Sequence, residues 1–134
     1  MQNIYSIILL LIVLVSCNSQ PLDDFHEEGN GLVRSITETL KPIHTREELL
    51  KAAPRLKGLF NDLVSVAIEA NEYSYYHPES ERINLSPEDH YLSDALREEL
   101  NRVCHIEGGR EIVEKCQEES LHRLDAFLSK SKKS

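Results

Sequence analysis

Apolar residues recur along much of the chain at the three- and four-residue spacing of amphipathic helices. One stripe runs through Leu32, Val33, Ile36 and Leu40. Pro42 predicts its end, because a proline disfavours helical geometry in the residue before it. A longer stripe follows Pro54, a residue suited to the first turn of a helix. This stripe predicts the main core helix of the chain, on Leu56, Leu59, Phe60, Leu63, Val66, Ala67 and Ala70.

Polar residues mark two helix starts. Thr45 and Glu48 have the spacing of a capping box, in which the hydroxyl accepts from a backbone N–H and the carboxylate reaches back. A short helix is therefore expected over residues 46–53. Ser86 before Pro87 predicts the other start, with a side-chain N-cap followed by a proline in the first turn.

The helix that starts at Pro87 is expected to run to about Cys104 on its apolar stripe. Gly108-Gly109 interrupts the pattern, and a last helix is expected over the apolar positions from Ile112 to Leu128. No segment alternates strictly between apolar and polar residues as a strand would. Short links between amphipathic helices favour antiparallel packing. The predicted fold class is all-α, a small bundle of three or four main antiparallel helices.

Residues 1–16 follow a different pattern. They contain no Asp, Glu, Lys or Arg, and Ile7 to Val15 is an unbroken run of nine apolar residues. As a helix this run would rise about 14 Å, about half of a hydrocarbon core of about 30 Å. It is too short to span a membrane but suits the apolar core of an export signal. Residues 1–16 are therefore predicted to be a signal peptide.

The last three residues of this signal peptide and the residue after it, Leu14-Val15-Ser16-Cys17, form a sequence that resembles the lipobox of bacterial prolipoproteins. The resemblance implies a diacylglycerol thioether on the Cys17 sulfur, cleavage just before Cys17, and acylation of the new amine. The chain departs from the pattern in that Met1-Gln2-Asn3 holds no Lys or Arg. A plain secretory signal is the alternative, and Asn84-Leu85-Ser86, which has the form of a glycosylation acceptor, would suit it.

Residues 17–31 are predicted to be the lipidated N-terminus and a flexible tether, ahead of a helical domain over residues 32–134. An apolar foot formed by Leu22 and Phe25 is the alternative for this stretch. In prolipoproteins of double-membrane bacteria, the residue after the lipidated cysteine influences sorting. Asn18 in place of Asp favours the outer membrane, facing the periplasm, over the inner membrane.

With Cys17 lipidated, Cys104 and Cys116 remain, and an exported protein meets an oxidising compartment. A disulfide between them is one alternative. Two separate core thiols are another, because the expected hairpin places the Cα atoms beyond the usual disulfide limit of about 7 Å. Zinc is a third, using Cys104-His105, Cys116 and His122, although their spacing matches no common zinc site. We expect no metal and no cofactor.

Charge and motifs narrow the function classes. The chain has 15 Lys+Arg and 23 Asp+Glu, a formal net charge of −8, and no basic stripe, which argues against a nucleic-acid partner. The sequence lacks the phosphate-loop, nucleophile-elbow and zinc-protease motifs. Adjacent acidic residues such as Glu98-Glu99 point about 100° apart on a helix. They therefore indicate solvent-exposed helix faces rather than a catalytic pair of carboxylates. We therefore expect no enzymatic activity.

Two segments are candidates for contact with partners. Tyr73, Tyr75, Tyr76 and His77 gather at the end of the core helix and predict an interaction patch, since tyrosine offers apolar area and a hydroxyl together. Rings that cap the bundle are the alternative. The basic tail Lys130-Ser131-Lys132-Lys133 suits anionic lipid head groups or an acidic partner, with a solubilising end as the alternative.

These patterns predict a small envelope lipoprotein, anchored in the membrane through Cys17, that acts as a non-enzymatic structural or protein-binding module. An envelope protein is its expected partner. The alternative is an exported helical protein that binds a small ligand or a metal, in a cleft near His77 or the turn between Cys104 and Cys116.

Overall fold

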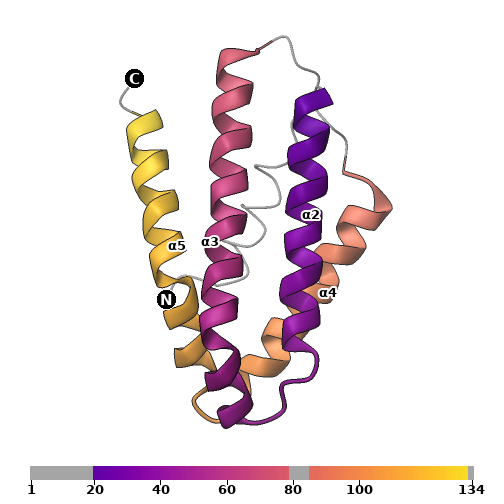
Figure 1. Cartoon of the computed structure of the whole chain (residues 1–134), viewed down its shortest axis with the longest axis vertical. Helices are drawn as coiled ribbons and strands as arrows, with labels where there is room; N and C mark the ends of the chain where they lie inside the picture. The colour runs from indigo at the N-terminus through magenta and orange to yellow at the C-terminus, as the bar shows by residue number, and fades with distance from the viewer. Residues whose placement is uncertain (1–19, 79–84, 133–134) are drawn as a thin grey trace.

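The chain forms a helical bundle in a computed structural model that describes residues 20–78 and 85–132. Consecutive helices run in opposite directions (Figure 1). The predicted all-α bundle is confirmed, and no helix within the described ranges is both long and apolar enough to cross a membrane. The helices are α2 (Gln20–Leu40), α3 (Arg46–Tyr76), α4 (Pro87–Cys104) and α5 (Gly109–Ser131).

The packing of the helices distinguishes the two ends of the bundle. α2 packs on α3 and α4, α3 also packs on α5, and the contact between α4 and α5 is less extensive. α4 and α5 meet near the link at residues 105–108 and diverge away from it (Figure 1). The opposite end holds the start of α2 and the last turns of α3 and α5, and α3 extends past both neighbours there (Figure 1).

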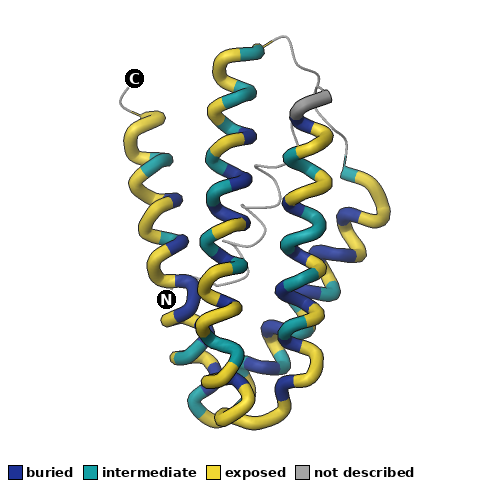
Figure 2. Tube along the Cα trace, in the orientation of Figure 1, coloured by how far each residue is buried: buried dark blue, intermediate teal, exposed yellow. Residues whose placement is uncertain are grey.

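Buried residues come from all four described helices (Figure 2), and their side chains form one core cluster. The stripe predicted for the core helix is buried on α3, apart from Leu59, which packs at the edge of the core. Apolar burial of this kind contributes about 25 cal/mol per Å² and is the main force holding the helices together. The most central side chains include Leu63, Val64, Leu96, Leu100, Val103 and Val113.

The tether predicted for residues 17–31 is wrong from residue 20 onward, because these residues form the first half of α2. Leu22 is fully buried, and it extends the stripe of Val33 and Ile36 toward the start of the helix. Gly29 has no apolar side chain to continue this stripe, which hides the pattern in the sequence. The acidic residues between Leu22 and Val33 are exposed. Residues 17–19, with Cys17, lie outside the described residues.

Pro54 does not start a new helix as predicted, since α3 is continuous from Arg46 to Tyr76. A proline inside a helix removes the hydrogen bond to the carbonyl four residues earlier, here that of Leu50. Both Pro54 and Leu50 lie on the exposed face of α3, where water can hydrogen-bond that carbonyl. The expected short helix over 46–53 and the core helix are therefore one element.

The two helix starts predicted from polar capping residues, at Thr45 and Ser86, are confirmed. The Thr45 hydroxyl accepts from the backbone N–H of Glu48 at 3.2 Å, and the Glu48 carboxylate accepts from that of His44 at 2.7 Å. Ser86 and Asp89 form a full capping box at the start of α4, with Pro87 in the first turn.

Arg102, near the end of α4, ties that helix to the link between α2 and α3. Its guanidinium donates to the backbone carbonyls of Leu40 at 2.8 Å, Lys41 at 3.2 Å and Ile43 at 2.6 Å. The Glu99 carboxylate accepts from the same guanidinium at 2.7 Å. Carbonyls at the end of a helix have no partner within the helix, so Arg102 caps α2 from a neighbouring element.

We expect Arg102→Ala to lower the free energy of unfolding by about 1–3 kcal/mol, because several charge-assisted hydrogen bonds are lost at once. Arg97→Ala is the matched control. Among the described residues Arg97 makes only an exposed ion pair with Asp94, so the variant should change stability by less than about 1 kcal/mol. Urea unfolding followed by circular dichroism measures both. Equal losses in the two variants would contradict the capping role.

Candidate functional site

The predicted aromatic patch lies at the end of α3, and the structure divides it into two parts. Tyr73 and His77 form the inner part: their rings stack 4.0 Å apart at 14°. The Tyr73 ring also lies 6.3 Å from that of Phe25 on α2. The backbone N–H of His77 donates to the carbonyl of Tyr73 and ends the helix. This part packs the end of α3 onto α2, as the capping alternative predicted.

Tyr75 and Tyr76 form the outer part of the patch. Their side chains are 73% and 74% exposed, and the two rings meet edge to face 5.3 Å apart. Most large apolar or aromatic side chains of the described residues are at least partly buried, so this pair stands out at the end of the bundle. We call Tyr75 and Tyr76 the tyrosine pair.

A polar cluster that sequence reasoning did not find joins α2 to the start of α4. Asp89 accepts at Oδ1 from the Asn30 amide at 2.9 Å, and His26 Nε2 lies 2.9 Å from the same oxygen. The side chain of Asp89 is only 3% exposed and that of His26 is 16% exposed. The other Asp89 oxygen accepts from the backbone N–H of Ser86 at 2.8 Å.

The environment of Asp89 favours its ionised form. Burial alone would raise the pKa of Asp89, but hydrogen bonds from the Ser86 backbone, the Asn30 amide and the Ser86 hydroxyl, with the nearby His26, outweigh it and hold the pKa below its ordinary value. The carboxylate also lies in the first turn of α4, where the helix dipole favours negative charge. Because an ionised Asp89 can only accept, the adjacent Nε2 of His26 carries the proton.

A carboxylate–imidazole pair can act as a base when the second ring nitrogen faces a nucleophile. In His26 that nitrogen, Nδ1, is buried and has no hydrogen-bond partner among the described residues. Asp89 itself is committed to the helix cap and to Asn30. The His26–Asn30–Asp89 cluster therefore serves to join α2 to the start of α4.

Cys104 and Cys116 are free cysteines in the structure. Cys116 is buried on α5, and its Sγ lies 3.6 Å from the carbonyl oxygen of Ala53 on α3. Cys104 is the last residue of α4 and is half-buried. Burial raises the pKa of both thiols, which reduces their reactive thiolate fraction.

We expect two alkylating groups to add to Cys104 and Cys116 when the protein is unfolded without reductant. The mass of the product, measured in a Cys17→Ser background, reports the number of groups. In the folded protein Cys104 should react before the more deeply buried Cys116. Addition of both groups only after reduction would show a disulfide instead.

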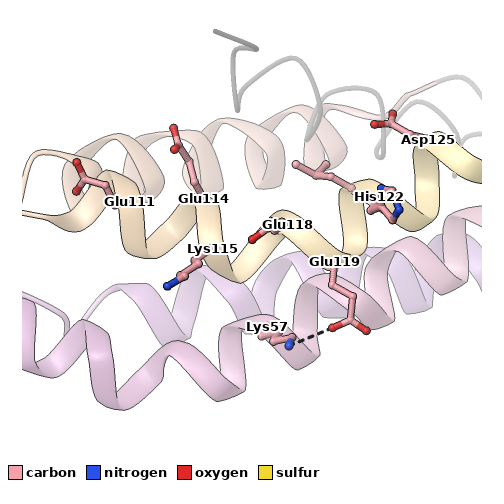
Figure 3. A pocket seen from close by; sticks show the side chains of 9 residues that line it. Lys57, Glu111, Glu114, Lys115, Glu118, Glu119, His122 and Asp125 are labelled. Carbon is pink, nitrogen blue, oxygen red and sulfur yellow. Dashed lines mark ion pairs between the residues drawn. The ribbon is translucent and has the colours of Figure 1, made fainter.

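An open pocket of about 890 Å³ runs along the outer face of α5 and is lined mainly by acidic side chains (Figure 3). Lys57 of α3 reaches across to Glu119 at 3.1 Å, and its hydrogen bond and charge lower the pKa of Glu119. His122, one of the zinc candidates, lies in this pocket, whereas Cys116 is buried. Among the described residues, no three His, Cys, Asp or Glu side chains are grouped to hold a metal ion.

Comparison of the chain with known protein families, curated proteins and solved structures finds no match.

The polar cluster escaped the sequence analysis because its members come from distant segments. His26 and Asn30 are four residues apart and share one face of α2, but they lay within the predicted tether. Ser86 was predicted only as the N-cap of a helix, and Asp89 lies in the first turn of that helix. The sequence does contain one signal for part of the cluster. Leu22, His26 and Asn30 follow one another at intervals of four residues, which places all three on the inner side of one helix.

Proposed function

We propose that this chain is a lipoprotein of the bacterial cell envelope, anchored in the membrane through lipid on Cys17. The observation that carries the proposal is the sequence Leu14-Val15-Ser16-Cys17 at the end of the nine-residue apolar run from Ile7 to Val15. A single acyl chain binds membranes only weakly, but two or three chains on one residue give lasting attachment. The anchor would retain a water-exposed, acidic domain at the membrane surface.

Within the envelope, Asn18 favours the outer membrane, with the helical domain in the periplasm. The domain acts as a non-enzymatic structural or protein-binding module. Two features support this role. The His26–Asn30–Asp89 cluster is engaged in joining α2 to α4, and the exposed tyrosine pair has the chemistry of a contact surface rather than of a reactive group.

Labelling of growing cells with palmitate tests the anchor. The wild-type protein should incorporate label, and Cys17→Ala should not. Cys104→Ala and Cys116→Ala are matched controls, because each also removes one thiol but leaves the lipobox intact. Both controls should be labelled as strongly as the wild type. Label that persists in Cys17→Ala, or that disappears in a control, would refute the proposed anchor.

A further inference from the structure

We propose that the tyrosine pair, Tyr75 and Tyr76, contacts the lipid surface and holds the bundle end-on against the membrane. The inference rests on the proposed anchor at Cys17. It adds a second point of contact and gives the anchored domain a defined orientation.

The first argument is the length of chain between the anchor and the bundle. Cys17 and the first residue of α2, Gln20, are three residues apart in sequence. An extended chain covers at most about 3.6 Å per residue, so the start of α2 lies within about 11 Å of the lipidated residue. This link is far shorter than the predicted tether of residues 17–31 and keeps one end of the bundle at the membrane.

The second argument is what that end presents. The start of α2 and the last turn of α3 lie at the same end of the bundle, and α3 extends further (Figure 1). The tyrosine pair is in that last turn and is largely exposed. Tyrosine is enriched at membrane interfaces, where its ring lies among the acyl chains near the head groups and its hydroxyl remains hydrated. The position and the chemistry of the pair therefore fit a lipid surface.

Charge indicates that aromatic contact, rather than attraction to anionic lipid, carries the binding. α5 ends at this end of the bundle (Figure 1), and Lys130 in its last turn and Lys132 just after it are exposed, which favours anionic head groups. The early turns of α2 have the opposite effect, because they carry exposed acidic residues that repel anionic lipid, including Asp23, Asp24, Glu27 and Glu28. A contact through Tyr75 and Tyr76 should therefore persist on zwitterionic lipid and in high salt.

The anchor makes even a weak aromatic contact effective. Once Cys17 is in the bilayer, binding of the tyrosine pair is an intramolecular step at high effective concentration. The inner ring stack of Tyr73 on His77 and its contact with Phe25 fix the end of α3 to α2. A contact made by the pair would thus orient the whole bundle rather than a loose segment.

The sequence contains no tryptophan, so one introduced tryptophan reports a single position. We would place the full-length lipidated variants Tyr76→Trp and Tyr91→Trp in phosphatidylcholine vesicles, with and without brominated lipid. Tyr91 is the matched control because it is 71% exposed but lies on α4, which begins well short of this end (Figure 1). The expected result is blue-shifted emission and quenching by brominated lipid for Tyr76→Trp only, unchanged in high salt.

Each other outcome overturns the inference in a recognisable way. Lipidated protein that floats with vesicles but shows water-like, unquenched emission from Tyr76→Trp refutes the membrane contact and leaves the anchor intact. Protein that lacks the lipid mass and does not float refutes the anchor, and the inference with it. Emission that shifts only in native envelope membranes, and not in protein-free vesicles, assigns the tyrosine pair to a protein partner.

Discussion

We expect Gly109→Ala to lower the free energy of unfolding by about 3 kcal/mol or more, among the largest effects of a single methyl group in this chain. A Cβ at Gly109 would lie 2.2 Å from the backbone carbonyl oxygen of Val103 and 3.3 Å from Cβ of Ile106. A backbone atom cannot move aside as a flexible side chain can. The variant must therefore open the tight turn between α4 and α5, where Gly108 adopts φ 74°.

Gly58→Ala is the matched control for this prediction. Gly58 is an exposed residue within α3, and a Cβ there would meet nothing within 4 Å. Alanine favours a helix over glycine by about 0.5–1 kcal/mol, so this variant should be more stable than the wild type. Urea unfolding in a Cys17→Ser background, which cannot form the thioether, measures both. Stability changes of the same sign would contradict the geometry of the turn.

The second large effect is expected at Asp89. Asp89→Ala should cost about 2–4 kcal/mol, because it removes a helix cap and leaves partly buried donors of Asn30 and His26 without their acceptor. Asp94→Ala, on the same helix, is the control. Asp94 is exposed and, within the part of the chain that the structure describes, pairs only with Arg97. Its loss should cost less than about 1 kcal/mol. Equal costs at the two positions would show that the buried cluster does not stabilise the fold.

The lowered pKa of Asp89 gives this prediction a pH dependence. A carboxyl group with a lower pKa in the folded than in the unfolded chain stabilises the fold above the unfolded pKa, about 3.9, and this stabilisation is lost as the pH falls through the folded value. The stability difference between the wild type and Asp89→Asn should therefore be full near about pH 7 and shrink below about pH 4. A difference that is constant with pH would contradict an ionised Asp89 in the fold.

The helices could largely be predicted from the sequence because their signals are local. Ser86-Pro87 at the start of α4 and Gly108-Gly109 at the turn are such signals, and the structure confirms both. Two boundaries were wrong because tertiary contacts outweighed local preference. Burial of Leu22 extends α2 through an acidic, glycine-containing stretch, and exposure of Pro54 lets α3 continue through a proline.

The candidate site could be predicted only in part. The tyrosines were evident as a cluster, but their division into a packed Tyr73 and an exposed tyrosine pair depends on where α2 lies against α3. The His26–Asp89 contact joins residues 63 positions apart, and no local pattern contains it. Spacing alone could not decide between a Cys104–Cys116 disulfide and two separate thiols. The path of the link at residues 105–108 sets which way Cys116 faces.

The new start of α2 changes the expected arrangement of the anchored protein. A flexible tether over residues 17–31 would have let the domain move freely away from the membrane. With the proposed anchor on Cys17, a helix that begins at Gln20 would instead keep the end that carries the tyrosine pair close to the lipid. The far end of the bundle, with the links at residues 41–45 and 105–108, would then be the part most accessible to the proposed envelope partner.

Mass spectrometry of the mature protein from cell envelopes tests the proposed lipid anchor on Cys17. We expect an N-terminal peptide that begins at Cys17 and carries the mass of a diacylglycerol thioether, with or without a third acyl chain. An unmodified N-terminus at Cys17 or at any other residue, or a chain that retains Met1 to Ser16, would contradict it.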